Sequence, residues 1–152
     1  MGFEDFLGSI DTIFYGRVSY ESWGNFQPEE NATATEQALW KEVHSKKKFV
    51  FSSREREERG ATFISTDIEE QVARIKEADG KDIWLYGGAG LIKTFIDLDL
   101  IDVFKLSVHP VVLGAGKPLF EDLQNRIQLR LLRTNTFRTG VVQLIYEPSQ
   151  RS

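Results

Sequence analysis

The chain of 152 residues contains no cysteine and only two histidines, His44 and His109. Without cysteine there can be neither a disulfide nor a thiolate zinc site, and two histidines are too few for a histidine-rich metal centre. We therefore expect no metal in the functional site.

The sequence also lacks an excess of positive charge and any long apolar run. It has 19 basic and 23 acidic residues, a formal net charge of −4, which gives no general attraction for nucleic acid or for an anionic membrane. There is no apolar run of about 18 residues and no secretory leader pattern at the N-terminus. We expect a cytoplasmic protein, and the length favours a single domain over residues 1–152.

Short β-rich runs alternate with helical patterns over the first two thirds of the chain. The predicted strands are Thr12 to Gly16, Lys48 to Ser53, Ala61 to Thr66 and Asp82 to Gly87. The predicted helices are Arg17 to Trp23, Thr35 to Val43, a helix after Thr66 with Glu69 in a capping box and Gly80 as its stop, and a helix from Gly90. This order predicts an α/β fold with a mostly parallel central sheet flanked by helices.

After Asp102 the pattern changes to strands without a convincing helix. We expect antiparallel strands on the edge of the sheet. In the segment 127–131 apolar and polar residues alternate, which predicts a strand with one wet face. The charged run from Arg54 to Arg59 is interpreted as a solvated loop.

Three glycines stand in the four positions 87–90, where a predicted strand meets a predicted helix. Glycine lets an anion approach the main chain, and a helix N-terminus offers it N–H groups. A P-loop is disfavoured because Ile92, not glycine, precedes Lys93, and the third glycine of a dinucleotide fingerprint is missing at Lys93. Tight packing between strand and helix, without a ligand, is the alternative interpretation.

Two other predicted strands end in groups that bind anions. Gly16 is followed by Arg17 and Ser19, and Ser53 is followed by Arg54. The carboxyl ends of parallel strands meet at one edge of a sheet, so these groups and the glycines predict a site for an extended phosphorylated cofactor. Taken one at a time, Arg17 and Arg54 would be interpreted as surface residues and Ser19 as a helix cap.

These segments together resemble the dihydrofolate reductase-like superfamily, and within it the C-terminal reductase domain of the bifunctional riboflavin-biosynthesis deaminase/reductase. The resemblance runs from about Phe3 to Pro148. It rests on "DTIFYGRVSYES", "FSSR", "IWLYGGAGLIKTFIDLDLIDVFKLSVHPVVLGAGKPLF" and "VVQLIYEP".

The resemblance implies a dihydrofolate reductase-like fold and an NADPH-dependent reductase. The implied cofactor-binding residues are Gly16, Arg17, Ser19, Ser53, Arg54, Tyr86, Gly87, Gly88, Ala89, Gly90 and Leu91. Among them Ser53 and Arg54 would bind the adenosine 2′-phosphate, and Tyr86 would face the nicotinamide or the substrate. The implied substrate-binding residues are Gly114, Gly116 and Phe120.

The family begins with a central strand that carries a Ser-x-Asp-Gly-like segment, and this chain starts near the helix that follows it. We expect that strand to be absent from the chain, which would leave sheet edges for a homodimer or a strand from elsewhere to cover.

No catalytic residue is identified from the sequence. Hydride transfer is the chemistry of the cofactor, so no nucleophile is required. The carboxylates of Asp11 and Glu21 and the imidazole of His109 are interpreted as structural, and the three tryptophans as core.

The first hypothesis is therefore a reductase of a small heterocyclic or carbonyl compound, for example a ribosylaminopyrimidine of the riboflavin pathway. The second is a nucleotide-binding module without turnover. A flavin-binding or purely structural dimer subunit is the third.

Overall fold

The computed structural model describes residues 3–54, 60–78 and 80–149. The chain divides into two compact units, residues 1–92 and 93–152, and each is described by itself. The expectation of one domain stays a prediction. The charged run predicted as a solvated loop lies, apart from Arg54, outside the described residues.

The first unit is built on a four-stranded parallel sheet with the order β3-β2-β1-β4. Its strands are β1 (Ile10–Gly16), β2 (Lys47–Phe51), β3 (Thr62–Ile64) and β4 (Asp82–Tyr86). Each lies within two residues of its predicted boundaries, and β3 is three residues shorter than predicted. Parallel strands need crossover connections, and the helices between them supply these.

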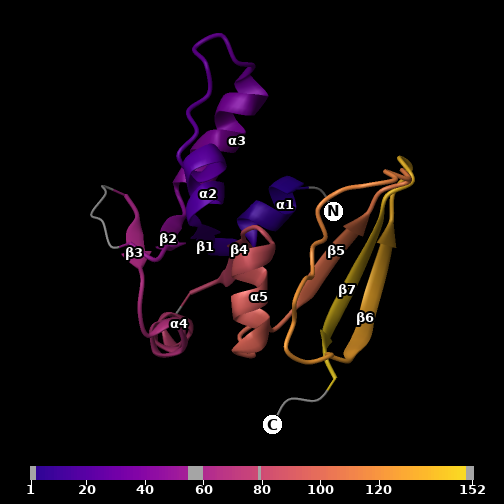
Figure 1. Ribbon diagram of the computed structural model, residues 1–152. Helices are drawn as coiled ribbons and strands as arrows, with labels where there is room; N and C mark the ends of the chain where they lie inside the picture. The colour runs from indigo at the N-terminus through magenta and orange to yellow at the C-terminus, as the bar shows by residue number, and fades with distance from the viewer. Residues whose placement is uncertain (1–2, 55–59, 79, 150–152) are drawn as a thin grey trace. The chain divides into compact units, whose positions relative to one another are not determined.

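The helices of this unit are α1 (Phe3–Gly8), α2 (Arg17–Ser19), the π-helix η1 (Tyr20–Gly24), α3 (Ala34–His44), α4 (Ile68–Glu77) and the start of α5 (Ala89–Asp97). In Figure 1, α2 and α3 lie on one side of the sheet and α4 on the other. The core on the side of α1 and α3 contains the fully buried residues Leu7, Ile13, Tyr15, Val43 and Val50. No helix in the described part of the chain is long and apolar enough to cross a membrane.

The predicted helix from Arg17 to Trp23 forms, but its second half is a π-helix. The Asn25 amide donates to the carbonyl of Tyr20 over 2.8 Å, five residues back. Gly24, at the end of η1, lies directly on the rings of Tyr15 and Tyr20. Ring packing at this position is a tertiary effect, so local sequence signals did not reveal the wider turn.

The capping box predicted at Thr66 and Glu69 is wrong. The residue that precedes α4 is Asp67, whose backbone is left-handed with φ 52° and whose side chain makes no cap hydrogen bond. Thr66 therefore lies one position too early to cap the helix, and its carbonyl instead accepts from the side-chain amide of Gln71.

The second unit contains a separate antiparallel sheet with the order β5-β7-β6. Its strands are β5 (Phe104–Val108), β6 (Leu129–Thr136) and β7 (Val142–Pro148). The change to antiparallel strands is confirmed, but their expected place on the edge of the parallel sheet is wrong, because they pair with one another.

The predicted wet-face alternation at 127–131 does not hold along β6. The pairing with β7 shifts between Leu131 and Arg133, which leaves Leu132 as an extra residue. Leu131 and Leu132 are adjacent in the strand and both are exposed. A bulge breaks the period of two, and it depends on the partner strand rather than on the local pattern.

Replacing Gly24 by alanine should destabilise the first unit. A Cβ atom there would lie 2.8 Å from Cζ of Tyr15 and 2.9 Å from Cδ1 of Tyr20, and both rings are buried. Overpacking of this kind costs about 1 to 3 kcal/mol, which urea unfolding would measure. Gly8→Ala is the control, because a Cβ at Gly8 meets nothing within 4 Å. Equal stability of the two variants would contradict this packing.

Candidate functional site

The carboxyl ends of the four parallel strands lie at one edge of the first unit's sheet. Gly16 pairs with Phe51, and Phe51 pairs with Ile64, so the residues after β1, β2 and β3 are neighbours. Tyr15 pairs with Tyr86, which places the glycine turn after β4 beside Gly16. With strands about 4.8 Å apart, this edge is long enough for an extended ligand.

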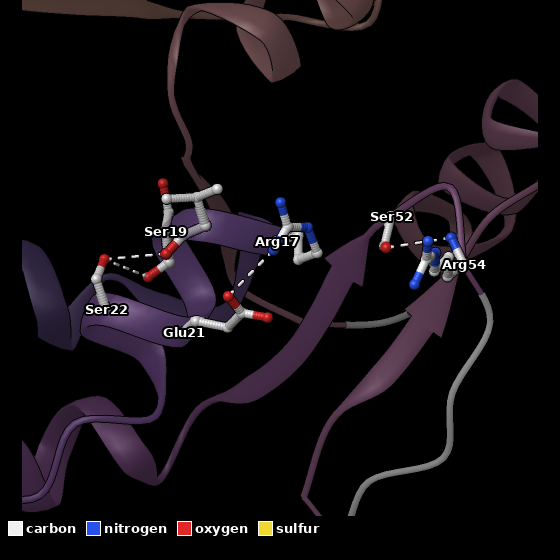
Figure 2. Close-up of polar contacts among 7 residues, drawn as sticks. Arg17, Ser19, Glu21, Ser22, Ser52 and Arg54 are labelled. Carbon is white, nitrogen blue, oxygen red and sulfur yellow. Dashed lines mark hydrogen bonds and ion pairs between the residues drawn. The ribbon is translucent and has the colours of Figure 1, made fainter.

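At the end of β1, Arg17 begins α2 and carries its guanidinium at the sheet edge. Its Nη1 atom donates to Oε2 of Glu21 over 3.2 Å, and both side chains are about half exposed. Figure 2 shows this pair on the same edge as Ser52 and Arg54. Ser19 lies on the same short helix, and its carbonyl accepts from the hydroxyl of Ser22.

At the end of β2, the backbone turns away from the sheet through residues 52–54. The Ser52 amide donates to the carbonyl of Ile64 over 3.0 Å, and the Ser52 hydroxyl accepts from the Arg54 amide over 3.2 Å. These two bonds hold the turn, while Ser53 and Arg54 are exposed. An exposed hydroxyl and a guanidinium on a fixed turn suit a phosphate monoester.

At the end of β4, the glycines divide into two kinds. A Cβ at Gly87 would lie 2.8 Å from Cδ2 and 3.0 Å from Cβ of Leu91, so here glycine is required by packing between β4 and α5. At Gly88 and Gly90 a Cβ would meet nothing within 4 Å, and neither residue has a left-handed φ. Neither packing nor backbone conformation therefore requires glycine at these two positions, and without a side chain the main chain there is open to close approach.

Tyr86 lies in an aromatic cluster below this edge. Its ring stacks on Trp23 with a centroid distance of 4.6 Å and an interplanar angle of 21°, and it meets Tyr15 and Trp84 edge-on. Trp23 and Trp84 pack against the core, as the sequence indicated, and so does Trp40.

The sequence did not reveal the polar clamp that holds η1 to α3 and β2. The Lys48 ammonium donates to the carbonyl of Gly24 over 2.8 Å and to Nδ1 of His44 over 2.7 Å. Because an ammonium only donates and a carbonyl only accepts, His44 is neutral and its Nε2–H donates to the carbonyl of Phe26 over 2.6 Å. His44 and Lys48 are about 20 positions from the two carbonyls that they bind, and no local motif links them to these.

The residues predicted to bind substrate belong to the second unit. Gly114, Gly116 and Phe120 are exposed in the segment between β5 and β6. Gly114 has φ 76°, a left-handed conformation that favours glycine, and the ring of Phe120 meets Phe104 edge-on at 6.2 Å. Their role in substrate binding stays a prediction.

Two carboxylates of the first unit are already engaged. Asp11 accepts from the Lys81 amide over 2.8 Å and from the Thr12 hydroxyl over 2.9 Å, and these bonds, that from Lys81 above all, lower the pKa of Asp11. Glu21 holds Arg17. Among the residues that the structure describes, no group of three or more His, Asp or Glu side chains could hold a metal ion.

Comparison with known proteins places this chain among reductase-like domains. The family model described as the RibD C-terminal domain matches residues 18–143. The uncharacterized protein YyaP of Bacillus subtilis (strain 168) is 56% identical over 147 residues, which is 96% of this chain and 78% of that protein. YwjB of the same strain is 36% identical over 147 residues, covering 95% and 78%.

Solved structures agree on the fold. A putative riboflavin biosynthesis protein from Shewanella sp. PV-4 superposes with a TM-score of 0.77 at 19% identity, over 99% of this chain and 80% of that one. Acinetobacter baumannii RibD gives 0.66 at 15%, over 96% and 49%. Dihydrofolate reductase from Enterococcus faecalis, solved with NADP(H), gives 0.65 at 15%, over 97% and 80%. The predicted dihydrofolate reductase-like fold is confirmed.

Alanine substitutions at Gly87 and at Gly88 should differ in their effect on the stability of the protein. Gly87→Ala should lower the free energy of unfolding by about 1 to 3 kcal/mol, since the new Cβ collides with Leu91. Gly88→Ala should leave stability nearly unchanged, because the space around it is open. Urea unfolding of the matched pair checks this, and a large loss in Gly88→Ala would show that packing explains both glycines.

The clamp at His44 predicts a pH dependence of stability. Burial lowers the pKa of His44 below its usual 6.5, and the neighbouring Lys48 charge adds to this. The folded state therefore binds fewer protons than the unfolded state, so the stabilisation is complete above pH 6.5 and is lost as the pH falls below that value. The free energy of unfolding, measured at pH values from 7.5 down to 5.5, should decrease as the pH decreases.

His44→Gln should flatten this pH dependence, while His109→Gln, which changes the only other histidine, should retain it. The same slope in wild type and His44→Gln would contradict the clamp.

Proposed function

Because this chain belongs to the family of RibD C-terminal domains, we propose that it is an NADPH-dependent reductase of a small heterocyclic compound. The observation that carries the proposal is the common edge of the parallel sheet, where Arg17, Arg54 and the glycine turn at 87–90 follow strands that pair in register. Cationic side chains and open main chain in one row are what a dinucleotide with several phosphates requires.

The phosphate groups of the cofactor have residues along this edge that would fit them. The turn at Gly88 to Gly90 would suit the diphosphate, since a Cβ at Gly88 or Gly90 would meet no atom within 4 Å among the residues that the structure describes. Arg17 and Ser19 would contact phosphate from the neighbouring strand end, after Gly16. Ser53 and Arg54 would bind the 2′-phosphate that distinguishes NADPH from NADH.

The protein would contribute to the reaction by orienting and enclosing the cofactor and the substrate. A bound nicotinamide supplies the hydride. Gly87 lets Leu91 pack against β4, and this contact fixes the start of α5 and with it the direction of the turn amides. The stacking of Tyr86 on Trp23 supports the same strand end from below.

The proposed substrate class follows from the relatives. The family is named for RibD, and one similar structure is called a pyrimidine reductase-like protein of Corynebacterium diphtheriae. A ribosylaminopyrimidine such as 5-amino-6-(5-phosphoribosylamino)uracil is the substrate to test first, with Gly114, Gly116 and Phe120 as candidate substrate contacts.

We also propose that the protein acts as a homodimer. The segment after β5 exposes Val111, Val112 and Leu113, with exposed fractions of 65%, 97% and 78%. A run of large apolar side chains in water is typical of a surface that another chain covers. The cytoplasmic location stays a prediction.

Fluorescence titration tests the cofactor proposal. Arg54→Ala should weaken NADPH binding about ten- to one-hundredfold, because one charge-assisted phosphate contact is lost. NADH binding should not change, since NADH lacks the 2′-phosphate. Arg74→Ala, which removes an exposed arginine of α4, is the matched control and should bind both like wild type.

No binding of either nucleotide, or equal weakening of both by Arg54→Ala, would contradict the assignment of the 2′-phosphate site. Binding without oxidation of NADPH in the presence of pyrimidine substrates would favour the second hypothesis, a nucleotide-binding module without turnover.

A further inference from the structure

Arg17 begins α2, a helix of three residues that continues directly into η1. The side chain is 54% exposed and is directed to Glu21 one turn later, at an Nη1 to Oε2 distance of 3.2 Å. Glu21 lies in η1, so the ion pair links the first residue of α2 to the π-helix that follows it.

The ion pair between Arg17 and Glu21 is weak enough for a phosphate to replace Glu21 as the partner of Arg17. Its two side chains are 54% and 43% exposed, and exposed ion pairs of this kind are weak. A phosphate at the strand ends would compete with the carboxylate of Glu21 for the same guanidinium, and the two anions would repel each other.

We propose that Glu21 is a positioning residue that sets the affinity of the phosphate site by holding Arg17 when no ligand is bound. The inference rests on the proposed NADPH site and adds to it a residue that weakens binding. Glu21 keeps the guanidinium oriented at the edge of the sheet and is displaced from it by the phosphate. The cofactor can then leave easily, because Arg17 has a partner to which it returns.

The test is the affinity of Glu21→Gln for NADPH, measured by fluorescence titration. The variant should bind NADPH about two- to fivefold more tightly than wild type, which corresponds to the usual strength of an exposed ion pair. A role in folding alone would not raise affinity. Glu70→Gln is the matched control: it breaks an exposed i,i+4 pair with an arginine, Arg74 on α4, and makes the same change in net charge, and it should bind like wild type.

If Glu21 acts by holding Arg17, the gain in NADPH affinity of Glu21→Gln must depend on Arg17. In an Arg17→Ala background the gain from Glu21→Gln should be smaller, because only the repulsion between the carboxylate and the phosphate is then removed, so the double-mutant cycle should show coupling. Thermal unfolding of each variant confirms that it is folded.

If wild type binds NADPH but Glu21→Gln binds equally or more weakly, or gains as much without Arg17, the role of Glu21 is wrong while the cofactor site stands. If wild type does not bind NADPH, the proposed function fails and this inference fails with it.

Discussion

The parallel pairing of β1 with both β2 and β4 is the constraint on which the candidate site depends. β1 is buried along nearly its whole length, and its register with the two neighbours brings the three strands to an end together. Because the strands are parallel, every connection leaves from the same edge. Residues as far apart in the sequence as Arg17 and Gly90 thereby form one row of cationic side chains and bare main chain.

The helices and loops on this sheet adjust to the packing of its aromatic side chains. Gly24 gives room to Tyr15 and Tyr20, Gly87 gives room to Leu91, and Lys48 ties the end of η1 to α3 through His44. These contacts fix where Arg17 and the turn after β4 lie. Packing requires glycine at Gly24 and Gly87 but not at Gly88, where a Cβ would meet nothing within 4 Å.

The sequence predicted the strands and helices well, but it did not predict the local irregularities within them. Apolar runs such as "TIFYG" and "DIWLY" identify strands because burial is encoded locally, and the glycine turn indicates where a helix must begin. Nothing in the structure explains the left-handed Asp67, whereas the π-turn at Tyr20 and the bulge at Leu132 depend on packing against, or pairing with, another strand. For the same reason the site's residue types could be predicted, but the ion pair at Arg17 and the clamp at His44 could not.

The most direct measurement of the central claim is an amide NMR titration with NADPH. If the strand ends form one cofactor site, the amides of Arg17, Arg54 and Gly88 should shift together and saturate at the same concentration, while amides of α3 change little. Shifts confined to one of these three positions, or centred on another part of the chain, would contradict a single site at this edge of the sheet.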